Sequence, residues 1–141
     1  MTIWKKPASL EAMNKLSFDC MVDHLGIEFT EIGHDFIKAS MPVDKRTHQP
    51  MGLLHGGASV ALAETLGSTG AVLACPEGYA GVGLEINANH MRGVRSGHVH
   101  ATARPLHIGR TTHVWSIEIE DDQGKLVCAS RLTMAIISTQ N

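Results

Sequence analysis

The pattern of hydrophobic and polar positions predicts a hairpin, one long helix and then an antiparallel meander. Apolar runs bounded by turn residues indicate strands at 27–32, 36–43, 81–91, 97–106, 112–121 and 126–137. The run 112–121 alternates cleanly, because Trp115, Ile117 and Ile119 fall on one face and polar residues on the other. Such alternation is typical of a strand with one buried face.

Local signals mark the ends of several of these elements. Residues 33–35 predict a turn between the first two strands, and residues 122–124 (Asp-Gln-Gly) predict a hairpin turn before the last one. Ser9 is placed to cap a short helix that begins with Glu11 in its first turn. We find no linker, repeat or low-complexity segment, so residues 1–141 are expected to form a single domain.

The long helix is predicted over 56–75, where the sequence GGASVALAETLGSTGAVLAC is rich in Gly, Ala and Ser. Glycine inside a helix costs roughly 1 kcal/mol relative to alanine, so close approach of another element is expected to offset it. We expect a sheet to grip this helix on one side, which is an α+β architecture. A membrane-spanning helix is a poor alternative, because Glu64 stands in the middle and small polar residues surround it.

Composition narrows the class of protein without identifying a function. The chain has 141 residues and a formal net charge of −2, which argues against broad binding to nucleic acids. Its three cysteines show no paired spacing, and the N-terminus carries no apolar run of the kind a signal peptide needs. A reducing, cytoplasmic location and no membrane association are therefore expected.

Glu64 is the first candidate for chemistry. It is the single formal charge in the helical segment 56–75, and burying a lone carboxylate is costly unless it is paired, protonated or used. The alternative is a structural carboxylate that pairs with a cation across an interface. Ser68 lies one helical turn further on, where its hydroxyl either hydrogen-bonds this carboxylate or simply packs as a small residue.

Other familiar catalytic arrangements are missing from the sequence. There is no GxSxG elbow, Rossmann glycine pattern or P-loop, so serine-hydrolase, dehydrogenase and kinase functions are disfavoured. His98 and His100 share one strand face, but no acidic or cysteine ligand lies beside them in the sequence. We therefore expect neither a metal nor another cofactor. Cys75 ends the helix, where the helix dipole disfavours a thiolate nucleophile.

Three stretches of the sequence carry a resemblance to a known family: HQPMGLLHGGASVALAETLGS, GLEINANHMR and RPLHIGRTTHVW. Together they resemble the hotdog-fold acyl-CoA thioesterases of the phenylacetate-degradation type, over nearly the whole chain. Within this family the chain is similar to the 1,4-dihydroxy-2-naphthoyl-CoA hydrolases of menaquinone biosynthesis and to the proofreading thioesterases of enterobactin synthesis. The resemblance implies a hotdog fold, in which an antiparallel sheet wraps around one long central helix.

The resemblance also implies roles for particular residues. Glu64 would be the nucleophile or general base, and the residues around the thioester would be Gln49, His55 and Ser68. The oxyanion donor would be a backbone N–H of Gly56 or Gly57, which agrees with the unpaired donors and positive dipole at a helix N-terminus. The positions that would contact the CoA substrate are Gly83, His90, Met91, Arg92, Gly93, His107, Ile108, Gly109, Arg110, Thr111 and Thr112.

Each of these roles has a plainer alternative. His55 could tie down the entry to the helix instead of orienting the carbonyl. Gln49 is neutral and cannot be a base, so its amide would hold substrate or water. The loops at 90–93 and 107–112 combine glycine with arginine, which suits phosphate binding, although surface arginines also simply solvate hairpins.

Helix geometry predicts that the active site is shared between two chains. Gly56 and Glu64 are eight residues apart, so their Cα atoms lie about 12 Å apart along one helix. An oxyanion donor and the attacking group must both lie about 3 Å from their reacting atoms, a gap that one helix spans poorly. A homodimer solves this, and the resemblance adds that dimers pair into homotetramers.

These observations predict a cytoplasmic hydrolase that cleaves aromatic acyl-CoA thioesters, of the hydroxybenzoyl or 1,4-dihydroxy-2-naphthoyl type, to free acid and CoA. One alternative is a proofreading thioesterase acting on an acylated carrier protein. A second is a noncatalytic acyl-CoA-binding module, which would have no need of a carboxylate beside the carbonyl. A dehydratase on this fold would require a catalytic His together with an Asp or Glu, an arrangement that this helix does not supply.

Overall fold

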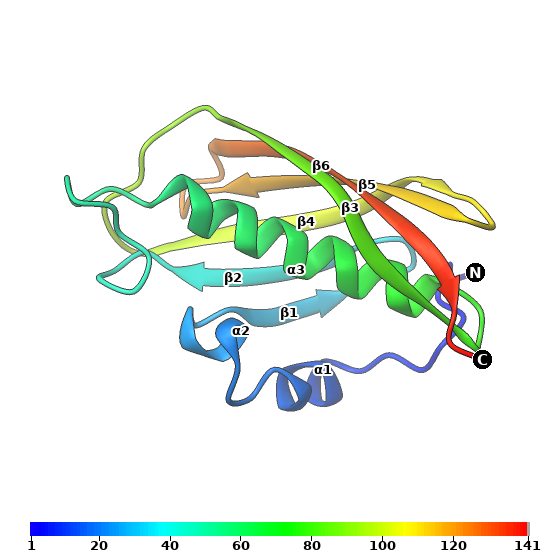
Figure 1. The fold of residues 1–141 in the computed structure, drawn as a ribbon. Coiled ribbons are helices and arrows are strands. Elements are labelled where there is room, and N and C mark those ends of the chain that lie inside the picture. The colour runs from blue at the N-terminus through cyan, green and yellow to red at the C-terminus, as the bar shows by residue number, and fades with distance from the viewer. Residues whose placement is uncertain (141) are drawn as a thin grey trace.

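One antiparallel sheet curves around one long helix, as the computed structural model shows for residues 1–140 (Figure 1). The first two strands follow two short helices, and the long helix separates these strands from the other four. In chain order the elements are α1 (Leu10–Leu16), α2 (Met21–His24), β1 (Glu28–Ile32), β2 (Ile37–Pro42), α3 (Gly56–Ala74), β3 (Tyr79–His90), β4 (His98–Ile108), β5 (Thr112–Glu120) and β6 (Leu126–Ser138). The predicted α+β hotdog arrangement is confirmed.

The sheet has six strands in the order β1-β2-β4-β5-β6-β3. The predicted hairpin of β1 and β2 is confirmed, as is the meander of β4, β5 and β6. The placement of β3 differs from the predicted four-stranded meander, because β3 pairs with β6 and not with β4. The reason is that β2 already occupies the free edge of β4, with Ile37 opposite Ala103. β3 therefore closes the opposite side of the sheet around α3.

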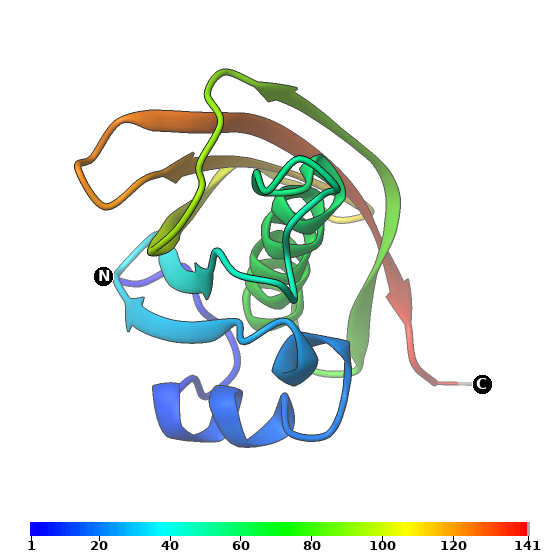
Figure 2. The same ribbon diagram turned by 90° about the vertical axis from the view of Figure 1, so that its left-hand side faces the viewer.

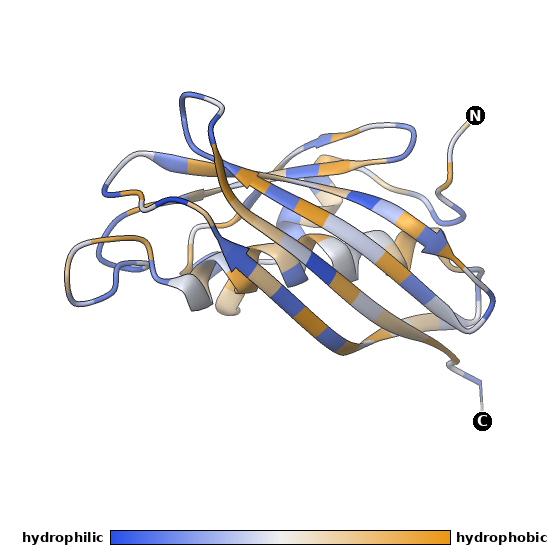
Figure 3. Ribbon diagram, turned by 90° about the horizontal axis from the view of Figure 1, so that it is seen from above, coloured by the Kyte–Doolittle hydropathy of each residue, from blue (hydrophilic) through white to orange (hydrophobic). Residues whose placement is uncertain are grey.

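The core lies between the concave face of the sheet and α3 (Figure 2). Trp115, Ile117 and Ile119 are 0% exposed, as the alternation along β5 predicted. The strands show the same alternation of hydrophobic and hydrophilic residues in Figure 3. The turns at both predicted positions are also present: Gly33 N–H donates to the Phe36 carbonyl, and Gly124 N–H to the Asp121 carbonyl.

The glycines of α3 let the sheet approach the helix closely. A Cβ placed on Gly70 would lie 2.7 Å from the nearest indole atom of Trp115, and one on Gly67 would lie 2.5 Å from Leu132 Cδ2. These contacts leave no room for a methyl group at either position. Tight packing of α3 against β5 and β6 therefore offsets the low helix propensity of these glycines, as predicted.

Hydrogen bonds from neighbouring segments cap the C-terminal end of α3 and the N-terminal end of α1. The backbone N–H groups of Lys5 and Lys6 donate to the Leu73 carbonyl at 2.9 and 3.1 Å, so the N-terminal segment covers the end of the helix. α1 begins where Ser9 Oγ accepts from Ala12 N–H at 3.1 Å, which confirms the predicted cap.

Among the helices of residues 1–140, none combines the length and apolar character required to cross a membrane.

Candidate active site

Glu64 lines a cavity beside α3. This first cavity has a volume of about 610 Å³ and lies between α2 and one face of α3. The carboxylate is half-buried, and Glu64 makes no ion pair with any residue of 1–140. Apart from Glu64 the cavity has no charged residue; its other lining residues are Met21, Val22, Leu25, Ile27, Gly57, Val60, Ala61, Thr65, Ser68 and Thr69. A single carboxylate thus faces a mostly apolar space.

Of the two roles that the sequence left open for Ser68, the structure shows no hydrogen bond to the Glu64 carboxylate within residues 1–140. Ser68 lines the same cavity, but its hydroxyl points to Met134 Sδ at 3.8 Å and not to the carboxylate. Gly83 of β3 lies beside Glu64, because a Cβ placed there would be 3.2 Å from Glu64 Oε1. The missing side chain at Gly83 therefore leaves space next to the carboxylate.

The N-terminus of α3 supplies one free backbone donor. His55 is the N-cap, and its Nδ1 accepts from Gly57 N–H at 2.8 Å. Because Nδ1 is the acceptor, the ring proton of neutral His55 is on Nε2. Gly56 N–H donates to no group within residues 1–140. Of the two glycines predicted to hold an oxyanion, Gly56 is therefore the one whose N–H is available.

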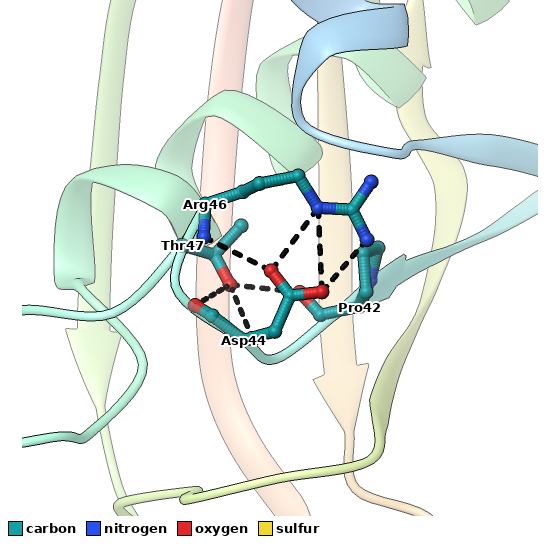
Figure 4. A network of polar contacts seen from close by, with 4 residues as sticks. All are labelled: Pro42, Asp44, Arg46 and Thr47. Carbon is teal, nitrogen blue, oxygen red and sulfur yellow. Dashed lines mark hydrogen bonds and ion pairs between the residues drawn. The ribbon is translucent and has the colours of Figure 1, made fainter.

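A polar network fixes the loop that leads to this cap (Figure 4). Arg46 Nη2 donates to Asp44 Oδ2 at 2.7 Å, and this hydrogen bond, with one from Arg46 N–H, lowers the pKa of Asp44 to about 2. Thr47 Oγ1 donates to the Pro42 carbonyl at 2.8 Å, and the Thr47 carbonyl accepts from His55 N–H at 2.8 Å. The network thereby connects the end of β2 to the residue that caps α3.

The side chain of Gln49 is oriented by its own loop. Its Oε1 accepts from Met51 N–H at 2.6 Å and from Leu53 N–H at 3.2 Å. Two backbone donors thus face the oxygen, which leaves the amide NH₂ as the free group. The neighbouring His48 has a structural contact instead, because its Nε2 donates to the Arg95 carbonyl at 2.8 Å.

Gln49 and Gly56 line a second cavity, of about 340 Å³, on the other side of the helix N-terminus. The predicted substrate-binding residues His90, Met91, Arg92 and Gly93 line it as well. His90 lies directly over Gly56, because a Cβ placed on Gly56 would meet His90 Nε2 at 2.9 Å. Glycine at position 56 is therefore required for the imidazole to reach the helix terminus.

Sequence reasoning missed Ser59 in this second cavity. Its side chain is 1% exposed and lines this cavity. Thr65 and Thr69 of the same helix donate to carbonyls one turn earlier, at 2.7 Å each. The signal that could have found Ser59 is its position three residues after Gly56, on the same helical face.

The second predicted substrate loop lies at the other end of α3. Ile108, Gly109 and Arg110 line a third cavity of about 320 Å³, together with residues that were not predicted: Lys5, Ala74, Pro76, Tyr79 and His113. The other predicted residues of this loop lie around it. His107 covers Gly109, the Thr112 carbonyl accepts from Gly109 N–H, and the Thr111 carbonyl accepts from Ile136 N–H.

One chain does not bring the predicted catalytic residues together. Glu64, Ser68 and Gly57 line the first cavity, whereas Gln49 and Gly56 line the second. His55 lies between them as the cap of the helix. The carboxylate and the free N–H at the helix terminus are thus on separate surfaces of one helix.

The histidine pair on β4 has an acidic neighbour that the sequence did not reveal. His100 Nε2 lies 2.7 Å from Asp122 Oδ1, and His98 N–H donates to Asp122 Oδ2 at 3.1 Å. The hydrogen bond from His100, followed by the one from His98, lowers the pKa of Asp122. Within residues 1–140, no three His, Cys, Asp or Glu side chains are grouped to hold a metal ion.

Comparisons with known proteins identify the family of this chain. The sequence matches the thioesterase superfamily over residues 51–128. It is 53% identical over 135 residues to the proofreading thioesterase EntH of Cronobacter turicensis, covering 96% of this chain and 98% of that protein. It is 54% identical over 136 residues to the 1,4-dihydroxy-2-naphthoyl-CoA hydrolase of Escherichia coli, covering 96% of this chain and 99% of that one. A crystal structure of a Haemophilus influenzae thioesterase superposes with a TM-score of 0.97 at 52% identity, covering 99% of this chain and 98% of that chain. The chain therefore belongs to the thioesterase superfamily and is a hydrolase of thioesters with the hotdog fold.

Proposed function

We propose that this thioesterase hydrolyses aromatic acyl-CoA thioesters, of the hydroxybenzoyl or 1,4-dihydroxy-2-naphthoyl type, to the free acid and CoA. The observation that carries this proposal is Glu64, a carboxylate that makes no ion pair within residues 1–140 and faces a largely apolar cavity of about 610 Å³. A flat, mostly apolar acyl group suits such a lining. The Escherichia coli relative, named for 1,4-dihydroxy-2-naphthoyl-CoA, supports this choice of substrate and a place in menaquinone biosynthesis.

The proposed mechanism divides the work between the helix terminus and the carboxylate. Gly56 N–H and His55 Nε2–H donate to the thioester oxygen, where negative charge develops in the transition state. Glu64 either attacks the carbonyl carbon or takes a proton from a water that attacks it. The C–S bond then breaks and the thiolate of CoA leaves. On the nucleophilic route, a water then hydrolyses the acyl anhydride formed on Glu64, which releases the free acid and restores the carboxylate. Gln49 and Ser68 hold substrate or water beside these groups.

A homodimer completes this site. β3 is an edge strand of twelve residues with one charged side chain, Glu85, and with Leu84 64% exposed. A long, exposed edge of this kind pairs readily with another strand. Two copies of β3 that pair antiparallel about a two-fold axis would continue the sheet. Glu64, beside Gly83 of β3, would then approach the helix N-terminus of the second copy, and dimers would pair further into homotetramers.

A second candidate is a proofreading role on acylated carrier proteins, which the relative named EntH favours. A carrier protein presents the same thioester on a phosphopantetheine arm, so the catalytic groups would be unchanged. For either substrate we propose a cytoplasmic location, which agrees with three free cysteines: Cys20, Cys75 and Cys128.

The test is thiol release from benzoyl-, 1,4-dihydroxy-2-naphthoyl- and fatty acyl-CoA, and from an acylated carrier protein. Glu64→Gln is expected to lower kcat by roughly two to three orders of magnitude while CoA esters still bind. Glu11→Gln, at an exposed carboxylate of α1, is the matched control and should leave kcat unchanged. Binding without thiol release by the wild type would favour the noncatalytic module. Faster turnover of the carrier-protein thioester would favour the proofreading role.

A further inference from the structure

The polar side chains that line the first cavity all come from α3. They are Glu64, Thr65, Ser68 and Thr69, whereas the lining residues from other segments are apolar. Thr65 directly follows Glu64 in the helix, and both side chains are half-buried. A group bound against the carboxylate therefore also meets the hydroxyl of Thr65.

The hydroxyl protons on this face of the helix are already engaged within the protein. Thr65 Oγ1 donates to the Ala61 carbonyl at 2.7 Å, and Thr69 Oγ1 donates to the Thr65 carbonyl at 2.7 Å. Ser68 Oγ is directed at Met134 Sδ, 3.8 Å away. A hydroxyl group has one proton and two lone pairs, so these oxygens can offer a ligand only their lone pairs.

Each polar side chain that lines the first cavity is thus a hydrogen-bond acceptor. The Glu64 carboxylate accepts when it is ionised, and the three hydroxyl oxygens accept because their protons are engaged. A ligand group that donates, such as a hydroxyl, gains a hydrogen bond in this lining. An ether oxygen or a second carboxylate meets only lone pairs and negative charge, so its loss of hydration is not compensated.

We propose that Thr65 is a specificity-determining residue, whose oxygen accepts a hydrogen bond from a donor on the acyl group, such as a ring hydroxyl. Thr65 is one residue from Glu64, about 1.5 Å further along α3, so a ring attached to the reacting carbonyl carbon lies beside it. The assignment rests on the proposed function and deepens it, because it states which feature of the acyl group the cavity selects. Acyl groups without a donor, or with an additional carboxylate, are selected against.

The experiment compares hydroxybenzoyl-, methoxybenzoyl- and benzoyl-CoA, with the hydroxyl and methoxy groups at each ring position in turn. The wild type is expected to show a higher kcat/KM for at least one hydroxybenzoyl ester than for the matching methoxybenzoyl ester and the benzoyl ester. Thr65→Val keeps the shape of the side chain and removes the oxygen. It should lower kcat/KM for that hydroxybenzoyl ester by about fivefold, the effect of one neutral hydrogen bond, and change the benzoyl value by less than about twofold.

Two further variants separate hydrogen bonding from packing. Thr65→Ser keeps the oxygen and should retain the wild-type preference for the hydroxyl group. Thr102→Val makes the same chemical change at a half-buried threonine of β4 that lines none of the three cavities described above, and it should change no ratio. An equal loss on all three kinds of ester in Thr65→Val would overturn the assignment, because it indicates a structural role. So would an unchanged preference in Thr65→Val, or a wild type that prefers no hydroxybenzoyl ester.

Failure of the proposed function can be recognised separately, because binding does not require hydrolysis. Calorimetry measures the affinities of CoA thioethers with the same three kinds of ring, in which a methylene group between the sulfur and the carbonyl carbon prevents hydrolysis. The wild type could hydrolyse no aromatic ester and yet bind a hydroxylated thioether about fivefold more tightly than Thr65→Val does. The assignment would then hold although the proposed function fails. Equal affinities of the two proteins, or no binding of any thioether, would overturn the assignment.

Discussion

Gly57 N–H donates to Nδ1 of His55, two residues earlier, at a distance of 2.8 Å. This one bond caps the helix, places the imidazole proton on Nε2 and removes Gly57 N–H from the set of available donors. Gly56 N–H and His55 Nε2–H remain as donors for a substrate oxygen. The cap and the proposed oxyanion site are therefore parts of the same local structure.

Two substitutions of His55 are expected to separate these two roles. His55→Ala removes the cap and should lower the free energy of unfolding by about 1 kcal/mol, and kcat by roughly two orders of magnitude. His55→Asn keeps a good capping residue, so stability should return, while kcat stays low because the Nε2 donor is missing. Urea unfolding and steady-state kinetics measure the two effects. Full activity in His55→Asn would show that His55 is only a cap.

Mixed dimers test whether the active site is shared between chains. Glu64→Gln and His55→Ala are each expected to be nearly inactive alone. After subunit exchange at equal amounts, a shared site predicts recovery to about a quarter of wild-type activity, because half of the dimers regain one of two sites. The chain carrying both substitutions, mixed with itself, is the control. No recovery, despite proven exchange, would place Glu64 and His55 of one chain in the same site.

Gly70 and Trp115 are expected to be energetically coupled. Gly70→Ala places a methyl group 2.7 Å from the indole, so it should destabilise the protein by about 1–2 kcal/mol despite better helix propensity. In the Trp115→Phe background the ring is smaller, and Gly70→Ala should be neutral or stabilising there. Denaturant unfolding of the four proteins gives the coupling energy. Equal effects of Gly70→Ala in both backgrounds would contradict the packing.

The carboxylate of Asp44 is expected to make stability depend on pH in the acid range. Its pKa is about 2 in the folded protein against an ordinary value of 3.8, because Arg46 stabilises the charged form. This contribution is present above the ordinary value and is lost as the pH falls toward the folded one. Asp44→Asn should therefore be less stable than the wild type near neutral pH, and the difference should shrink steadily as the pH falls toward about 2.

Salt gives a second check on this prediction, because Asp44 and Arg46 are exposed and their attraction is screened. Added salt should reduce the difference between the wild type and Asp44→Asn near neutral pH. A difference that is independent of both pH and salt would mean that the carboxylate shape, and not its charge, holds the loop.

Local patterns in the sequence were enough to predict most of the elements. The alternation along β5 predicted the buried Trp115, and the glycines of α3 predicted close contact with the sheet. Both are short-range signals, because strand and helix periods relate residues a few positions apart. The order of the strands is a long-range property, and the sequence misplaced β3, which pairs with β6 across 38 to 59 residues of chain.

The candidate site divides in the same way. Glu64 was identifiable because a lone charge in an apolar helix is conspicuous, and Gly56 because it begins that helix. The sequence did not show that His55 occupies Gly57 N–H, that Ser68 faces Met134, or that Ser59 lies buried in the second cavity. Those facts depend on side-chain directions set by packing.

The sequence by itself determined the family, the reaction class and the residue types available for catalysis, because these follow from long motifs and local chemistry. Only the tertiary structure decided that Glu64 and Gly56 line different cavities, and that Lys5, Arg110 and His113 line one cavity at the C-terminal end of α3. The physical reason is that folding brings together groups from distant parts of the chain. Local periodicity relates only residues a few positions apart, so it does not indicate which distant residues will be in contact.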